Sequence, residues 1–214
     1  MNLSHPITAI TSPLTGRVLE ALSATTKPLS AADVARLVRD GSRVGVWKAL
    51  NRLAEQGIVL ADERGSAVYY AANREHLAWA AVEQLTGLRT ALREAIAAAI
   101  LPWPVAPVHA SLFGSAARGD ADAASDVDLL LVRPDGLSDD DEASWDDQLD
   151  RLRDRVLRIT GNRAQTLSLT PSRLEEHVRA GDPLVDAWRR DGILLAGAPL
   201  SVLLGGPQPA MTSL

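Results

Sequence analysis

The sequence predicts an α/β protein of the α+β type, in which two small domains are joined by a linker helix. Its 214 residues exceed the size of one ordinary domain of about 100–150 residues. A hydrophobic fraction of 46% with 23% charged residues is typical of globular chains that bury a core. Residues 1–75 carry nine Lys/Arg against seven Asp/Glu, whereas the rest of the chain carries thirteen against twenty, so the charge balance changes sign near residue 75. We therefore expect domains at residues 1–73 and 102–198, a linker helix at 74–101 and a loose tail at 199–214.

The composition excludes several classes of function. The chain has no cysteine, which rules out disulfides, a thiolate nucleophile and metal centres with cysteine ligands. Its four scattered histidines disfavour a metal site made of histidine alone. The longest apolar stretch, residues 95–108, contains prolines and is shorter than the roughly 20 residues of a membrane span. Because the first residues also lack the pattern of a secretory signal, we expect a cytoplasmic protein that does not associate with a membrane.

Three helices are predicted in the first domain from hydrophobic periodicity and capping residues. The first is expected at residues 15–22, the second begins after Ser30 and ends at Gly41, and the third spans residues 43–56. Ser42 is in the position of the N-cap of the third helix. The residues expected to face inward are Val18, Leu19, Leu22, Val34, Leu37, Val38, Val46, Leu50 and Leu53.

Two short strands, residues 58–60 and 68–70, are predicted on either side of a polar turn. With the three helices, and with the segment SRVGVWKALNRLAEQGIV, they resemble the winged helix-turn-helix domains of bacterial transcription regulators. The third helix of such a domain lies in the major groove of DNA. The resemblance implies a DNA-binding surface made of Ser42, Arg43, Gly45, Lys48, Asn51 and Arg52, with Arg64 of the turn in the minor groove or on phosphate. A net charge of only +2 is weak for a DNA-binding domain, so a winged helix that contacts protein alone is the alternative.

The linker is predicted to be one continuous helix over residues 74–100. It contains no proline, and its apolar residues recur at steps of three and four. The apolar stripe consists of Leu77, Ala81, Leu85, Leu88, Leu92, Ile96 and Ile100. This stripe has to be buried, either against the domain that follows or against the same helix of a second chain, which would make the protein a homodimer.

The residues that carry chemistry lie between positions 108 and 133. A buried strand at residues 108–113 is followed by Gly114 and Ser115, a short helix, and a second strand that begins after Ser125. Asp126 and Asp128 lie two positions apart at its start, so their side chains share one face roughly 6–7 Å apart along the strand. Two such carboxylates can hold one hard divalent cation. Gly114 allows a ligand to approach the backbone, and the start of the helix offers N–H groups to phosphate.

The stretch GSAARGDADAASDVDLLLV resembles the signature of the nucleotidyltransferase superfamily related to DNA polymerase β, especially its minimal bacterial members. Seven positions match in a fixed order, namely Gly114, Ser115, Arg118, Gly119, Ser125, Asp126 and Asp128. The resemblance implies that Asp126 and Asp128 are catalytic and hold Mg²⁺ or Mn²⁺. It also implies that Gly114, Ser115, Arg118 and Ser125 bind a nucleoside triphosphate, with ATP favoured. The alternative for Arg118 is an ion pair with an aspartate of the loop.

The remaining elements are those expected of an α/β domain. Helices are predicted at residues 138–160, 171–180 and 183–190, and strands at 163–169 and 192–197. In the first of these helices, Trp145, Leu149, Leu152, Val156 and Ile159 repeat at steps of four and three.

The strand at residues 163–169 departs from the pattern of the superfamily. Active members carry a third carboxylate there, which helps to activate the attacking hydroxyl. This strand offers Gln165 and Thr166, and because they lie on opposite faces, only one of them can point at the two aspartates. An amide can orient a hydroxyl but cannot take its proton. Candidate substitutes for the missing group are Glu175, Glu176, Asp182, His109 and His177.

Two functions from different classes follow. The first is a DNA-binding protein whose second domain transfers a nucleoside monophosphate to an acceptor hydroxyl of a protein, an RNA end or a small molecule. The second is a transcriptional regulator whose degenerate transferase domain only binds nucleotide or mediates dimerisation. The missing third carboxylate favours the second function, and the intact Asp126 and Asp128 favour the first.

Overall fold

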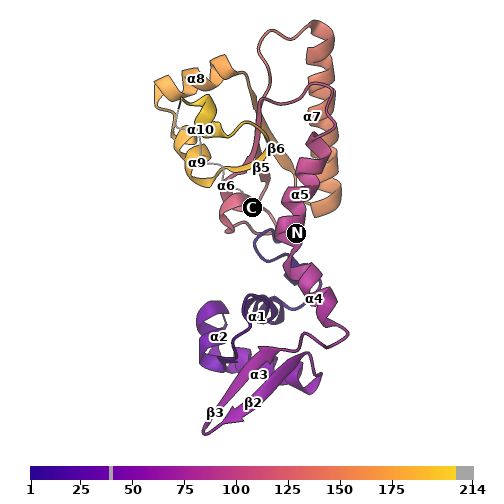
Figure 1. The fold of residues 1–214 in the computed structure, drawn as a ribbon, viewed down its shortest axis with the longest axis vertical. Coiled ribbons are helices and arrows are strands. Elements are labelled where there is room, and N and C mark those ends of the chain that lie inside the picture. The colour runs from indigo at the N-terminus through magenta and orange to yellow at the C-terminus, as the bar shows by residue number, and fades with distance from the viewer. Residues whose placement is uncertain (39–40, 206–214) are drawn as a thin grey trace. The chain divides into compact units, whose positions relative to one another are not determined.

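The computed structural model describes residues 1–38 and 41–205, and these divide into two compact units (Figure 1). The N-terminal unit comprises Asn2 and residues 4–90, and the C-terminal unit comprises Met1, Leu3 and the described residues from 91 onward. The mixture of helices with two sheets confirms the predicted α+β class. None of the described helices is both long enough and apolar enough to cross a membrane.

The N-terminal unit is a group of helices with a three-stranded antiparallel sheet of order β1-β3-β2. Its elements are η1 (Pro6–Ala9), α1 (Pro13–Ser23), β1 (Leu29–Ser30), α2 (Ala31–Val38), α3 (Arg43–Glu55), β2 (Val59–Arg64), β3 (Ala67–Ala72) and α4 (Trp79–Thr86). Val34 of α2, Val46 and Leu50 of α3, and Tyr70 of β3 meet in one buried core. The β2–β3 hairpin is longer than the two predicted strands, because its pairing continues to Arg64 opposite Ala67.

The capping signals of the sequence are found in the structure. The Ser42 hydroxyl accepts a hydrogen bond from the backbone N–H of Gly45 at 3.0 Å, which starts α3 at the predicted residue. Ser30 belongs to β1, and its hydroxyl accepts from the N–H of Asp33 at 3.2 Å. The prediction for Leu37 was wrong: this side chain is exposed, whereas Val34 and Val38 fill the inner face of α2.

The predicted continuous linker helix is wrong in its first turn and at its middle. Residues 74–78 are not helical, and Gly87 ends α4 before α5 (Leu88–Ile100) begins. Trp79 of α4 is buried in the core of the N-terminal unit, whereas Ile96 of α5 is buried in that of the C-terminal unit. Leu77 is 98% exposed. Of the predicted stripe, Leu77 and Ala81 are exposed, Leu85 packs on the N-terminal core, and the residues from Leu92 onward belong to the C-terminal core.

The C-terminal unit is built on a four-stranded mixed sheet of order β6-β5-β4-β7. After α5 its elements are β4 (His109–Phe113), α6 (Gly114–Arg118), β5 (Val127–Val132), α7 (Asp139–Thr160), β6 (Ala164–Leu169), α8 (Pro171–Ala180), α9 (Pro183–Asp191), β7 (Ile193–Gly197) and α10 (Leu200–Leu203). β5 pairs parallel with β6 and antiparallel with β4, and β4 pairs antiparallel with β7. Leu129–Val132 of β5 are fully buried, as the apolar sequence of a central strand predicts.

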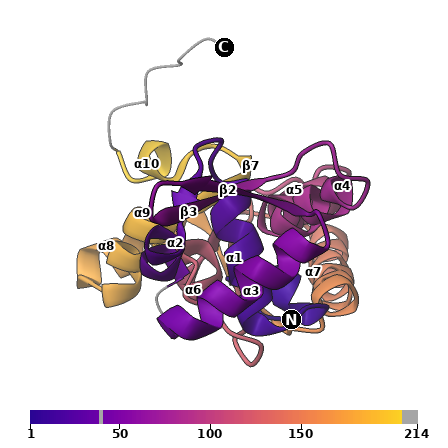
Figure 2. The ribbon, with the colours of Figure 1, turned by 90° about the horizontal axis from the view of Figure 1, so that it is seen from below.

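Helices cover both faces of this sheet (Figure 1). In Figure 2, α8 and α9 lie on one side of the view, and α5 and α7 lie on the other. Leu129 and Leu131 point to the face covered by α5 and α7, where Trp145 is buried with them. Leu130 and Val132 point to the other face, which α8 and α9 cover. Asp128 has the same parity as Leu130, so it belongs to the α9 face. Because helices cover both faces of the rest of β5, polar side chains can gather only at the start of this strand.

The end of α7 and the tail differ from the predictions in detail. Ile159 is exposed, and Thr160 takes the inward position, where its hydroxyl donates to the carbonyl of Val156 at 2.7 Å. The tail expected to be loose from residue 199 contains the short helix α10. Residues 206–214 of that predicted tail lie outside the described part of the chain.

Candidate functional site

Gly114 joins β4 to α6 in a conformation that suits glycine alone. Its φ is +69°, in the left-handed region, and a Cβ placed on it would lie 2.2 Å from Oδ2 of Asp128. The pairing of Phe113 with Asp128 across the β4–β5 ladder brings these two residues together. The missing side chain of Gly114 therefore provides the space that the Asp128 carboxylate occupies.

Asp126 and Asp128 form a pair of half-buried carboxylates at the start of β5. Burial raises the pKa of Asp128 above its ordinary value, and the negative charge of Asp126 raises it further. The charge of Arg118 acts in the opposite direction. The ionised pair is thus unfavourable by itself and would be stabilised by a cation between the carboxylates.

Gln165 of β6 lies beside the two aspartates. In the parallel β5–β6 ladder it is opposite Asp128, and its Nε2 donates to Oδ2 of Asp126 at 3.3 Å. Thr166 accepts a hydrogen bond from Nε of Arg153 at 2.9 Å. Of the two residues that the sequence leaves open, Gln165 is the one that faces the aspartates.

Arg118 is held beside this site by two carboxylates. Its Nε donates to Asp120 at 3.1 Å, and its Nη1 donates to Asp191 at 2.9 Å. Asp191 is the last residue of α9, its side chain is 4% exposed, and Arg190 also donates to it at 2.8 Å. These two guanidinium groups lower the pKa of Asp191 to about 2. Sequence reasoning missed Asp191, because it lies far from Arg118 along the chain and only the packing of α6 against α9 brings it there.

Ser125 and Ser115 form hydrogen bonds within their own segments of the chain. The Ser125 hydroxyl donates to Oδ1 of Asp122 and accepts from the Asp122 N–H, both at 2.9 Å, so it shapes the loop before β5. Asn162 donates to the carbonyl of Ser125, also at 2.9 Å. Ser115 lies in the first turn of α6, and its carbonyl accepts from Gly119 at 2.9 Å. Phe113 is the N-cap of α6 and provides no side-chain hydrogen bond to its N–H groups.

The candidate substitutes for a third carboxylate are engaged elsewhere. His109 bonds to Ser111 and the Ala198 carbonyl, and His177 bonds to Asp182 at 2.7 Å. Glu175 and Glu176 lie on α8 and pair with arginines of the same helix. The described structure therefore brings none of these five residues into contact with Asp126 or Asp128.

The donor set fits one hard divalent cation. Two carboxylates lie beside each other, and rotation of the Gln165 amide by half a turn would add a carbonyl oxygen, the ligand chemistry that Mg²⁺ and Mn²⁺ prefer. The space at Gly114 keeps Asp128 next to the backbone where a phosphate would lie. In the described part of the chain, no cluster of three or more His, Cys, Asp or Glu side chains gathers for a metal. A two-metal site would thus need ligands from a substrate.

Some of the residues predicted to contact DNA have free exposed surface, and others are hydrogen-bonded within the N-terminal unit. Ser42, Arg43 and Lys48 are exposed on α3. Asn51 accepts a hydrogen bond from the Tyr70 hydroxyl at 2.7 Å.

Three other residues of the predicted DNA-binding surface also contact residues of the N-terminal unit. Arg52 donates to the Thr15 hydroxyl at 2.7 Å. Gly45 is half-buried, and a Cβ there would lie 3.0 Å from Leu14. Arg64 pairs with Asp62 at 2.7 Å in the hairpin.

Two exposed apolar residues on α3 were not predicted as part of this surface. Val44 is 62% exposed and Trp47 is 50% exposed. They lie next to Arg43 and Lys48 in sequence, so α3 presents a mixed apolar and basic surface. Their spacing of three residues on a helix could have signalled it, because it places both on one face.

One comparison with known proteins bears on the C-terminal unit. An α+β unit with two adjacent carboxylates at the start of a central strand is what a metal-dependent phosphate chemistry requires. Residues 95–178 match the family model of the nucleotidyltransferase domain. The matched segment runs from α5 into α8 and contains Gly114, Asp126, Asp128 and Gln165. Residues 95–178 of the chain are therefore similar to the nucleotidyltransferase domain.

The other two comparisons add little. No curated protein matches the chain. Among solved structures, human N-acetylserotonin methyltransferase in complex with SAM is similar at 22% identity and a TM-score of 0.30. That likeness covers 46% of this chain and 30% of the methyltransferase chain, and it is too weak to bear on fold or function.

Proposed function

We propose that the C-terminal unit binds a nucleoside triphosphate, with ATP favoured, and transfers the nucleoside monophosphate to an acceptor hydroxyl. The observation that carries this proposal is the contact of Gly114 with Asp128 beside Asp126. Asp126 and Asp128 would hold Mg²⁺ or Mn²⁺, which would neutralise phosphate charge and orient the α-phosphorus for in-line attack. Pyrophosphate would leave.

The protein's own groups have separate roles in this proposal. Gly114 and the first N–H groups of α6, including that of Ser115, would bind phosphate oxygens. Ser125 shapes the loop that leads to Asp126. Arg118, kept in place by Asp191, favours the ionised form of Asp128 through its charge.

Gln165 favours a second candidate function. Its amide can hold an acceptor hydroxyl in place, but it cannot accept the proton, so turnover should be slow. The bond from Gln165 to Asp126 is the specific observation behind the alternative, a transcriptional regulator whose transferase domain binds nucleotide without transferring it.

Labelling with α-labelled ATP separates these two candidates. We expect weak labelling of added protein, RNA or lysate by the wild type, none by Asp128→Asn, and an increase with Gln165→Asp, because a carboxylate restores a base and a metal ligand. Thr166→Asp is the matched control, because that position contacts Arg153 instead of the aspartates. If nucleotide binds to all variants except Asp128→Asn and none of them labels any acceptor, the protein is a nucleotide-binding regulator.

We further propose that the N-terminal unit is a winged helix that binds duplex DNA through α3 and the β2–β3 hairpin. Support comes from the order of its helices and strands and from the exposure of Arg43 and Lys48 on α3. Val44 and Trp47 beside them would contact thymine methyl groups or sugars. Asn51 and the exposed Arg52 each make a hydrogen bond within the unit, so they would contribute less to DNA binding than Arg43 and Lys48 do.

Binding of genomic DNA fragments at several salt concentrations tests this proposal. Arg43→Ala and Lys48→Ala should each weaken binding and reduce the salt slope by about 0.9 for each phosphate that the variant no longer neutralises. Arg158→Ala removes one exposed charge from α7 of the other unit and should leave binding unchanged. If no fragment is retarded at low salt, α3 serves a protein contact instead.

A further inference from the structure

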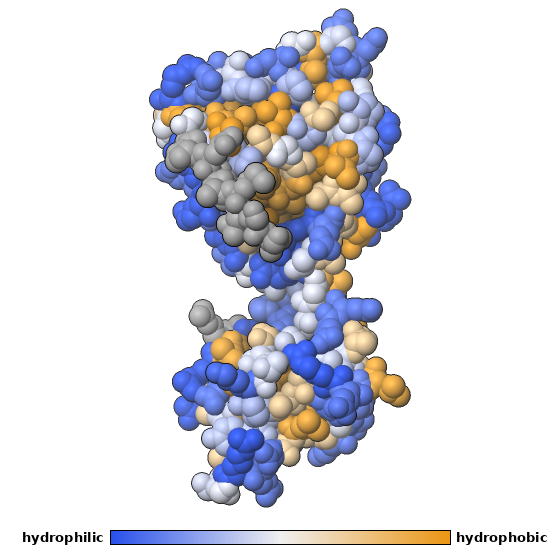
Figure 3. All heavy atoms as spheres, in the orientation of Figure 1, coloured by the Kyte–Doolittle hydropathy of each residue, from blue (hydrophilic) through white to orange (hydrophobic). Residues whose placement is uncertain are grey.

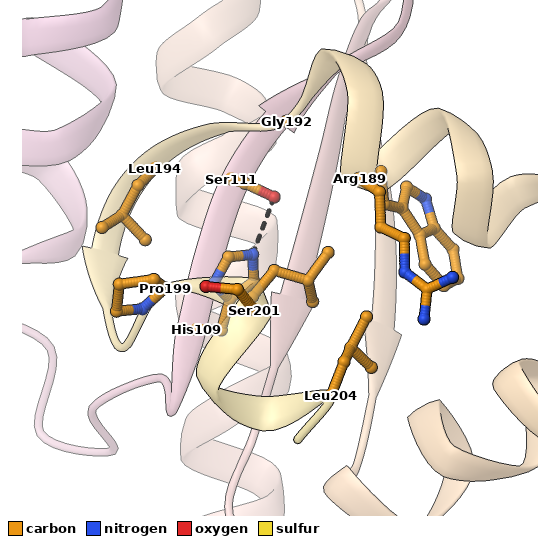
Figure 4. Close-up of a pocket in the computed structure, with 10 residues that line it drawn as sticks. His109, Ser111, Arg189, Gly192, Leu194, Pro199, Ser201 and Leu204 are labelled. Carbon is orange, nitrogen blue, oxygen red and sulfur yellow. Dashed lines mark hydrogen bonds between the residues drawn. The ribbon is translucent and has the colours of Figure 1, made fainter. Parts of the chain in front are cut away.

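A second cavity lies in the C-terminal unit, on the α9 face of the sheet. This cavity, which is distinct from the proposed nucleotide site, has a volume of about 440 Å³. It is bounded by β4, α9, β7 and α10 (Figure 4). Asp126, Asp128, Gly114 and Gln165 are not among its lining residues. In the space-filling view, hydrophobic surface gathers on the part of this unit that carries α9, α10 and β7 (Figure 3). The cavity is therefore separate from the proposed nucleotide site.

The floor of the cavity is polar but carries no charge. His109 and Ser111 are adjacent on one face of β4, and Nε2 of His109 lies 2.8 Å from the Ser111 hydroxyl (Figure 4). Nδ1 of His109 lies 2.7 Å from the carbonyl of Ala198. Burial lowers the pKa of His109, so the imidazole is neutral at pH 7. His109 and Ser111 thus have hydrogen-bond partners within the protein, and neither presents a charge to a ligand.

The wall and the rim have different chemistry. The wall is apolar and is made of Leu194, Pro199, Leu200 and Leu204. Arg189 lies on the side opposite Leu194 and Pro199 (Figure 4), its side chain is 51% exposed, and it is the one charged residue among the described lining residues. Its contact with Asp186 is long, at 4.0 Å, and both groups are exposed, so this ion pair is weak.

One of the lining residues is a buried tryptophan. Trp188 precedes Arg189 on α9 and also lines the cavity. Its indole Nε1 is buried and, among the buried side-chain polar atoms of the described residues, is the one without a hydrogen-bond partner. Because this nitrogen is inaccessible to solvent, it does not face the open cavity, and Arg189 is the described lining residue that can recognise charge.

We infer that this cavity binds a small monocarboxylate with an apolar body. The volume lies within the roughly 300–1,000 Å³ of small-molecule sites. The apolar body would contact the leucines of the wall. The carboxylate would pair with the Arg189 guanidinium at the rim. A neutral ligand would form no ion pair with the arginine, and a cation would be repelled by it.

Calorimetry of the full chain with octanoate and 1-octanol tests this inference. Octanoate should bind at least about 10-fold more tightly than 1-octanol, because its carboxylate adds one strong charged interaction. Arg189→Gln should remove that difference without changing the affinity for 1-octanol. Arg173→Gln is the matched control, because it removes an exposed arginine of α8 that does not line the cavity, and it should behave as wild type.

Three results would overturn the inference. They are no heat of binding with 1 mM octanoate, equal affinities for octanoate and 1-octanol, and unchanged octanoate affinity in Arg189→Gln. Because Arg189 is half exposed and only weakly paired, the variant should fold as the wild type does. Thermal unfolding of each variant checks this directly.

Discussion

Substitution of Gly114 by alanine tests the geometry on which the nucleotide site depends. Two separate costs arise there. A φ of +69° costs an L-residue about 1–2 kcal/mol, and the new Cβ would meet the Asp128 carboxylate at 2.2 Å. Asp128 then has to leave its rotamer, which costs roughly 0.5–1.5 kcal/mol more. Gly114→Ala should therefore lower the free energy of unfolding by about 2–3 kcal/mol and move a proposed metal ligand.

Gly136 provides the matched control for this substitution. Its φ is +68°, in the same unit, but a Cβ on it meets no atom within 4 Å. Gly136→Ala should lower the free energy of unfolding by only about 1–2 kcal/mol, through the backbone conformation alone. The difference between the two variants, about 1 kcal/mol, then measures the displacement of Asp128.

Urea unfolding and calorimetry with MgATP measure both consequences. Gly114→Ala should weaken Mg²⁺-dependent ATP binding by at least about 10-fold, the size of one strong charged contact, and Gly136→Ala should leave it unchanged. Wild-type ATP affinity in Gly114→Ala would refute the reasoning, because it would mean that Asp128 does not need its present position. Equal losses of stability in the two variants would show that the clash is relieved at no cost.

Three further predictions concern stability. Burial and the charge of Asp126 raise the pKa of Asp128, so ionisation of this carboxyl destabilises the fold. Without divalent metal, Asp128→Asn should therefore melt at a higher temperature than wild type at pH 7. This difference in melting temperature should disappear below pH 3.8, where the carboxyl is protonated in both the folded and the unfolded state. The pKa of Asp191 is lowered from 3.8 to about 2, so the stability that it contributes is complete above pH 4 and is lost as the pH falls to 2. In thermal unfolding, Asp191→Asn should be less stable than wild type at pH 7, and the difference should disappear as the pH falls to 2. Leu50→Ala, in the core of the N-terminal unit, should lower the free energy of unfolding by about 2–5 kcal/mol in urea melts, and a loss below 1 kcal/mol would contradict the packing described for α3.

Much of the local structure could be predicted from the sequence. The start of α3 at Arg43, the apolar central strand β5 and the helix that begins after Ser138 were all predicted from caps and periodicity. Such signals are local, because a cap acts within one turn of its helix and a buried strand is apolar over consecutive residues. Gly114 and the two aspartates could also be singled out, since they lie within one short segment of the chain.

By itself the sequence determined the class of the fold, most of its helices and strands, and which carboxylates stand together at the start of β5. Only the tertiary structure decided that Gln165 rather than Thr166 faces them, that Asp191 holds Arg118, and that the apolar stripe of the linker divides between two cores. The physical reason is the distance along the chain over which each kind of interaction acts. Caps and periodicity act over a few residues, whereas strand register and helix packing join residues dozens of positions apart, and many pairings of this kind are compatible with the same local pattern.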